Sequence, residues 1–133
     1  MKIDPDCIRD ILLAIEEKSD GFHDFCVSAV GAVTERDTPN EYTQKYNKDE
    51  LIYHIIQCNE NGFFTNMRKS ILGVYKIRDL SPEGHKFLNN IRDSCNWNKV
   101  KKQLLTAGSF SLKTLIEIAQ NIAVTALSAN LIK

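Results

Sequence analysis

Residues 48–78 contain a helix pattern followed by a hairpin pattern, with only an Asn-Gly turn between them. Asn47 and Glu50 have the spacing of a capping box at the start of the helix. Apolar side chains then recur at helical intervals, namely Leu51, Ile52, Ile55 and Cys58. The alternation that follows predicts two strands joined by a polar tip at Met67–Ser70. A helix that leads directly into a hairpin is typical of a winged helix-turn-helix, which we therefore expect.

Helix signals flank this region on both sides. A first helix is expected after Asp4-Pro5 and a further one after Ser81-Pro82, because each pair combines a capping side chain with proline in the first turn. A shorter helix with a basic face carries Trp97, and Ser111 caps a last helix that runs to about residue 130. The single tryptophan is predicted to be buried as an anchor of its helix.

The segment 22–47 has weaker signals, with a strand-like alternation in 22–34 and a polar, loop-like stretch in 35–47. The whole pattern predicts an α+β chain that is mainly helical: a winged helix-turn-helix with a two-stranded wing and additional C-terminal helices. We expect one domain over residues 1–133, with a core in 1–95 and a C-terminal helical extension in 96–133.

Composition limits the functional classes. The chain of 133 residues has 17 basic and 17 acidic side chains, so a global basic field for nucleic acid is absent and only a local patch remains possible. No apolar run approaches the roughly 20 residues that span a bilayer, and the N-terminus lacks a signal-peptide pattern. We expect a cytoplasmic protein without membrane contact, in which four widely spaced cysteines are free thiols.

Catalysis has little support in the sequence. None of the common nucleotide-binding, hydrolase or metalloprotease motifs is present, and the three histidines lie far apart. His23 and Cys26 form at most half of a zinc site. We expect no enzyme, no metal and no cofactor. For His85 we expect packing against the hairpin rather than a ligand contact.

Candidate contacts to double-stranded DNA come from the helix and hairpin of residues 48–78. Arg68 and Lys69 are adjacent basic residues at the expected wing tip, where a wing would meet phosphates. The expected recognition helix offers Tyr53, His54 and Gln57. Three acidic residues on the same helix, Asp49, Glu50 and Glu60, would oppose docking on DNA. Regulatory DNA binding and a protein-interaction role without DNA therefore both remain open.

The last helix has an apolar face that is wider than one core contact needs. A homodimer contact would explain this width, because large exposed apolar faces on soluble proteins usually mark interaction sites. A helix that is buried on both sides within one chain is the alternative. The interface candidates are Leu115, Ile116, Ala119, Ile122, Ala123 and Ala126.

Several segments, in the same order over nearly the whole chain, resemble the YjcQ-like family of small winged-helix proteins. They are Ile8-Arg9-Asp10-Ile11-Leu12-Leu13-Ala14-Ile15-Glu16, Tyr53-His54-Ile55, Leu80-Ser81-Pro82-Glu83-Gly84-His85, Ile91-Arg92-Asp93 and Trp97-Asn98-Lys99-Val100-Lys101. This resemblance implies a winged-helix fold and a phage, prophage or Gram-positive setting. It implies no established activity, so no catalytic residue is carried over. The stretch 24–46 departs from the family pattern. A host or phage protein is accordingly the expected partner in the absence of DNA binding.

Overall fold

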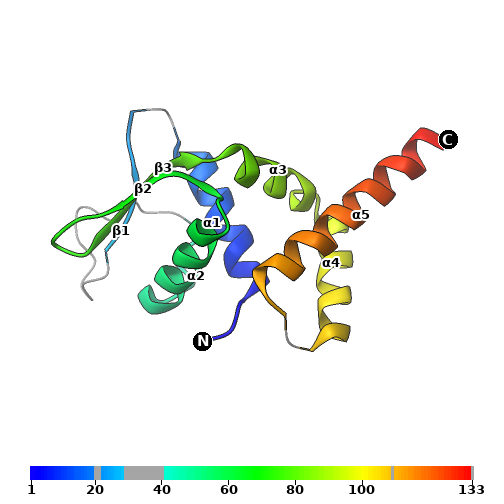
Figure 1. Cartoon of the computed structure of the whole chain (residues 1–133), viewed down its shortest axis with the longest axis horizontal. Helices are drawn as coiled ribbons and strands as arrows, with labels where there is room; N and C mark the ends of the chain where they lie inside the picture. The colour runs from blue at the N-terminus through cyan, green and yellow to red at the C-terminus, as the bar shows by residue number, and fades with distance from the viewer. Residues whose placement is uncertain (20–21, 29–40, 109, 133) are drawn as a thin grey trace.

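The computed structural model describes residues 1–19, 22–28, 41–108 and 110–132, and side chains up to Ser128. In chain order the described elements are α1 (Pro5–Lys18), β1 (Phe25–Ser28), α2 (Lys48–Glu60), β2 (Phe64–Lys69), β3 (Val74–Leu80), α3 (Pro82–Ile91), α4 (Ser94–Ala107) and α5 (Leu112–Ile132). The described part is thus α+β and mainly helical (Figure 1). Among these residues, no helix combines the length and apolar character that crossing a bilayer requires.

The three described strands form one antiparallel sheet in the order β1-β3-β2. Ile77 of β3 lies at the centre of this sheet, opposite Phe25 on one side and Met67 on the other. The strand expected in 22–34 is confirmed at Phe25–Ser28, and residues 29–34 lie outside the described part of the chain. Of the loop expected in 35–47, the part from residue 41 onward is confirmed as turns, and residues 35–40 lie outside the described part of the chain.

Local capping sets where the helices begin, as the sequence predicts. The side chain of Asp4 accepts hydrogen bonds from the backbone N–H groups of Asp6 and Cys7 at the start of α1. Asn47 accepts a hydrogen bond from the Glu50 N–H at 2.8 Å, which caps α2, and its side-chain amide donates to the Glu50 carboxylate at 2.7 Å. The second bond joins the two side chains, whereas in a full capping box the carboxylate accepts the backbone N–H of the capping residue. The bonds to the side chains of Asp4 and Asn47 satisfy backbone donors that a helix leaves without partners.

α3 is joined closely to the turn between α2 and β2. Its cap, Ser81, donates its backbone N–H to the carbonyl of Phe63 at 2.8 Å, and its hydroxyl bonds to the carbonyl of Gly62. Gly84 lies so close to this turn that a Cβ atom there would be 2.3 Å from the Phe63 oxygen. Only glycine fits this position without a backbone shift.

One apolar core extends through all five described helices and the sheet. α1 lies at its centre, and Ile8, Ile11 and Ile15 have no exposed surface. Trp97 of α4 is 3 % exposed, and its indole N–H donates to the Asp6 carboxylate at 2.9 Å, so the predicted burial is confirmed. Leu115 of α5 belongs to the same core. The C-terminal helices therefore share the core of the preceding elements.

α5 extends beyond the body of the protein. Its N-terminal part packs on α3 and α4, and its last buried side chain in the described chain is Ile122. Figure 1 shows the C-terminal part of the helix projecting away from the other elements. Val124 and Leu127 on this part are 57 % and 61 % exposed.

Candidate nucleic-acid interface

The tip of the β2–β3 hairpin is a tight turn at Ser70–Gly73. The Ser70 N–H donates to the Val74 carbonyl at 2.9 Å, and the Gly73 N–H donates to the Ser70 carbonyl at 3.0 Å. Gly73 has a φ of 81°, in the left-handed region that glycine adopts without strain. The prediction of a polar tip at Met67–Ser70 is therefore wrong, because β2 continues through Lys69 and the apex consists of Ile71 and Leu72.

Three basic side chains lie on one face of the sheet beside Asp24. Arg68 donates to one Asp24 oxygen at 2.5 Å, and Nε of Arg78 lies 3.2 Å from the other. Lys76 is opposite Arg68 in the strand register and, among the described residues, has no acidic side chain within ion-pair distance. Among the described residues, one carboxylate faces three cations here, so the described part of this face has a net positive charge.

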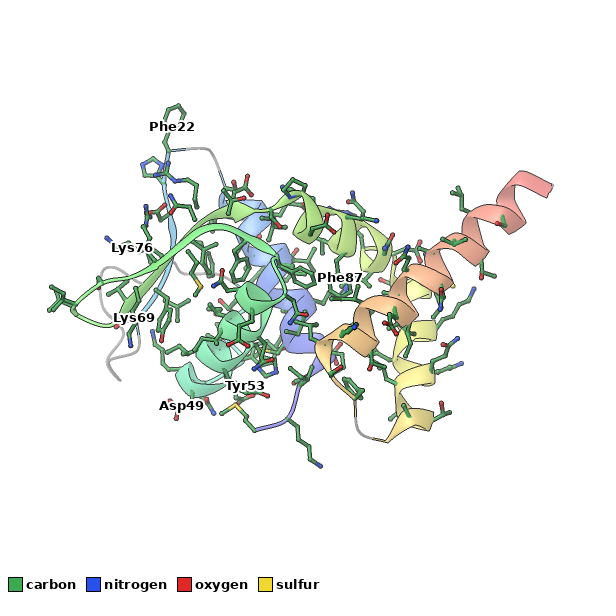
Figure 2. All side chains as sticks on the ribbon, viewed as in Figure 1. Phe22, Asp49, Tyr53, Lys69, Lys76 and Phe87 are labelled. Carbon is green, nitrogen blue, oxygen red and sulfur yellow. The ribbon has the colours of Figure 1, made fainter. Side chains whose placement is uncertain are left out.

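The other face of the hairpin carries Lys69. Its ammonium group lies 5.4 Å from the ring centroid of Tyr75, which is directly opposite in the register. Such a cation–π contact orients the lysine but leaves its charge available to an anion. Figure 2 shows Lys69 and Lys76 on opposite sides of the hairpin. The cations of the hairpin therefore flank its apex on both sides.

α2 contributes fewer candidate contacts to DNA than the sequence predicts. Tyr53 and Gln57 are both half-buried, and Tyr53 faces a small cavity that is also lined by Ile3 and Phe110. Asp49 and Glu60 on the same helix are exposed (Figure 2 labels Asp49 and Tyr53). The exposed part of α2 therefore offers carboxylates rather than cations to an approaching phosphate backbone.

His54 is not available to a ligand in this structure, because it is 1 % exposed. Its Nε2 accepts the backbone N–H of Asp4 at 2.8 Å, and its Nδ1 lies 2.7 Å from the carbonyl of Glu50. This pairing assigns a neutral ring with its proton on Nδ1. The expected role of His54 as a DNA contact is thus a misassignment. The helical spacing of His54 from Leu51 and Cys58 is the sequence signal that would have placed it on the buried face.

The six dimer candidates on α5 fall into two groups. Leu115, Ala119 and Ile122 are buried within the chain, so they are unavailable to a second copy unless the helix moves. Ile116, Ala123 and Ala126 are half-buried. The most exposed apolar residues of the described helix, Val124 and Leu127, are not among these six candidates, because the sequence does not show which part of the helix projects.

An open apolar cavity of about 570 Å³ lies where the N-terminal segment meets the end of α4. Its apolar lining includes Ile3, Leu104, Leu105 and Phe110, and Lys2 and Lys101 also contribute to its wall. Lys101 already pairs with Asp6 at 3.3 Å. Nothing in this lining resembles a set of catalytic groups.

The thiols and histidines give no reactive cluster in the described chain. Burial raises the pKa of the Cys7 and Cys58 thiols far above their ordinary value, which keeps both protonated. His85 is partly exposed, with Nε2 at 3.8 Å from the Asp79 carboxylate. The described residues contain no group of three His, Cys, Asp or Glu side chains that could hold a metal ion.

Comparison with known proteins gives one family. The model of a family described as hypothetical protein (DUF2513) matches residues 2–110. This match covers α1 to α4, including the hairpin and its basic residues. No curated protein and no solved structure matches the chain. The description of the family, like the resemblance in the sequence, assigns no activity.

Proposed function

The chain belongs to the family described as hypothetical protein (DUF2513), and we propose that it is a winged-helix domain that binds double-stranded DNA through its hairpin. The order of helix, strand, helix and hairpin supports this interpretation, as does the sheet order β1-β3-β2. In this proposal the β2–β3 hairpin is the wing. The role is regulatory rather than enzymatic, and the resemblance to phage-associated proteins suggests phage or host control sequences as targets.

The observation that carries the proposal is the charge of the hairpin. Four basic residues, Arg68, Lys69, Lys76 and Arg78, lie on β2 and β3. In the part of the chain that the structure describes, the nearby carboxylates are Asp24, which pairs with both arginines, and Asp79, which lies near the end of β3 beside His85. A local surplus of positive charge on a protruding ribbon suits a phosphate backbone, even though the net charge of the chain is zero.

The acidic residues of α2 limit how this domain docks. With Asp49 and Glu60 exposed, deep insertion of α2 into the major groove would place carboxylates near phosphates. We therefore propose that the hairpin supplies most of the binding energy. Tyr53 and Gln57, which are half-buried, remain as peripheral contacts to the duplex.

The experiment is a titration of a labelled duplex with the full chain, followed by fluorescence anisotropy between about 50 and 200 mM salt. Binding should weaken with salt, with a slope of roughly −3 for about three or four phosphate contacts. Changing Tyr53 or Gln57 to alanine should alter the affinity only slightly. An absence of salt-dependent binding to any duplex would exclude this function.

A protein-binding role is the second candidate, and the projecting end of α5 favours it. Val124 and Leu127 expose apolar surface where no other described element covers the helix. A second copy of the chain is one partner that this surface fits, and a host or phage protein is another. Self-association through α5 is also compatible with DNA binding, because the hairpin lies at the opposite end of the molecule (Figure 1).

A further inference from the structure

The apex of the hairpin has the wrong residue types for a turn that only faces water. The central positions of a tight turn usually hold polar residues, glycine or proline. Here they hold Ile71 and Leu72, which are 105 % and 60 % exposed. These side chains add nothing to the core, and their exposure to water is unfavourable. Two adjacent aliphatic side chains at the most protruding point of the hairpin indicate a surface that is covered in a complex.

The apex is also held firmly. The hydroxyl of Ser70 accepts the Val74 N–H at 3.1 Å, in addition to the two backbone bonds that close the turn. A turn that is already ordered loses little conformational entropy on binding. Ile71 and Leu72 therefore form a small apolar surface on an ordered turn rather than part of a flexible loop.

The charges behind the apex indicate what kind of partner covers it. Lys69 lies one residue before the turn on one side of the hairpin, and Arg68 and Lys76 lie on the other side. An apolar point with cations on both sides matches a DNA groove, which has phosphates along both walls and stacked bases at its floor. A purely apolar protein pocket would leave Lys69 and Lys76 without an anionic partner among the described residues, whereas Arg68 already pairs with Asp24.

We infer that Ile71 and Leu72 form a wedge that enters the minor groove, partly unstacks a base step and bends the duplex. This inference rests on the proposed DNA binding and adds the mode of contact. Apolar wedges of this kind kink DNA by about 20–90° in proteins that bind the minor groove. The flanking cations contact the phosphates on the two walls and hold the wedge in place.

The test measures bending and affinity separately. A duplex of about 30 base pairs carries a donor and an acceptor dye at its two ends, so that bending raises the energy transfer between them. The full wild-type chain should raise this transfer. The double variant Ile71→Ser, Leu72→Ser should bind about tenfold more weakly, as expected for losing burial of an aliphatic side chain, and without bending. Its salt slope should equal that of wild type, because the cations remain.

Leu105→Ser is the matched control, since Leu105 is 82 % exposed but lies on α4. It should change neither bending nor affinity. Binding without bending by wild type, or equal bending by the double variant, would overturn the wedge and leave DNA binding intact. Absence of salt-dependent duplex binding would instead remove the proposed function, and the wedge with it. Binding to phosphatidylserine vesicles but not to duplex would identify the apex as a membrane contact and likewise overturn the inference.

Discussion

The backbone N–H of Asp4 donates a hydrogen bond to Nε2 of His54 at 2.8 Å, which joins the start of α1 to the middle of α2. The other ring nitrogen of His54 bonds to the carbonyl of Glu50 within α2. Asp4 is also the cap of α1, so one residue both begins that helix and docks it on its neighbour. This relationship makes His54 a structural residue of the core.

His54→Ala should lower the free energy of unfolding by about 3 kcal/mol, because it leaves the N–H of Asp4 without its partner and opens a cavity in the core. His85→Ala is the control, since that ring is partly exposed and its loss should cost less than about 0.5 kcal/mol. Urea denaturation of both variants measures the difference. Equal stabilities for the two variants would contradict the role assigned to His54.

Gly84→Ala tests the close approach of α3 to the turn after α2. The added methyl group would meet the Phe63 carbonyl at 2.3 Å, which forces the backbone to shift. We expect a loss of about 2 kcal/mol in the free energy of unfolding, as for overpacking in a core. Gly62→Ala, at a positive φ but with open space around it, should show only the smaller cost of backbone strain. A neutral Gly84→Ala would show that this contact is not tight.

The pairing of Glu16 with Arg92 predicts a dependence of stability on pH. Arg92 donates two hydrogen bonds to the Glu16 carboxylate, at 2.7 and 2.6 Å, and these lower the pKa of Glu16 from its ordinary value of 4.5. The contribution of the pair is therefore complete above about pH 4.5 and is lost as the pH falls through the lower pKa of the folded state. Because the pair is partly exposed, it should contribute at most about 1 kcal/mol.

The measurement compares wild type with Glu16→Gln across this pH range. The difference in free energy of unfolding should be constant near neutral pH and shrink as the solution is acidified below about pH 4.5. Glu17→Gln, at an exposed position on the same helix, serves as the control and should track wild type. A Glu16→Gln difference that does not change with pH would rule out the ion pair as its source.

Self-association through the projecting end of α5 predicts a dimer at micromolar concentration. Leu127→Asp should convert it to a monomer without lowering the melting temperature, because Leu127 is 61 % exposed and makes little contact with the core. Ile122→Asp should instead unfold the chain, since Ile122 is 7 % exposed. Light scattering distinguishes these outcomes. A wild-type mass of 15.1 kDa at every concentration would exclude the dimer.

The sequence predicts those features of the fold that depend on residues close together in the chain. The caps at Asp4, Asn47 and Ser81 were predictable, because a capping side chain bonds to backbone groups two or three residues away. The existence of the hairpin was predictable for a similar reason, since the alternation of its strands is local, although the turn lies at Ser70–Gly73 and not at Met67–Ser70. The burial of Trp97 followed from its being the single tryptophan, a large apolar side chain in a small domain.

What the sequence analysis missed depends on contacts between distant segments. His54 is buried because the N-terminal segment lies over α2, and its bonding partner Asp4 is 50 residues away. The pairing of Arg68 and Arg78 with Asp24 depends on β1 lying beside the hairpin. Which residues of α5 are covered depends on where α3 and α4 end against it. Helical spacing places His54 on the buried face of α2, but none of these pairings between distant residues leaves a periodic signal in the sequence.

The salt dependence of duplex binding by Lys69→Ala, Lys76→Ala tests the central claim most directly. Among the described residues, neither lysine has an acidic partner that its loss would release. Lys86→Ala, Lys113→Ala is the matched control, because both lysines are exposed on other elements. The account predicts that the hairpin variant binds all duplexes more weakly and loses about two units of salt slope, while the control equals wild type. Equal slopes for wild type and the hairpin variant would contradict it.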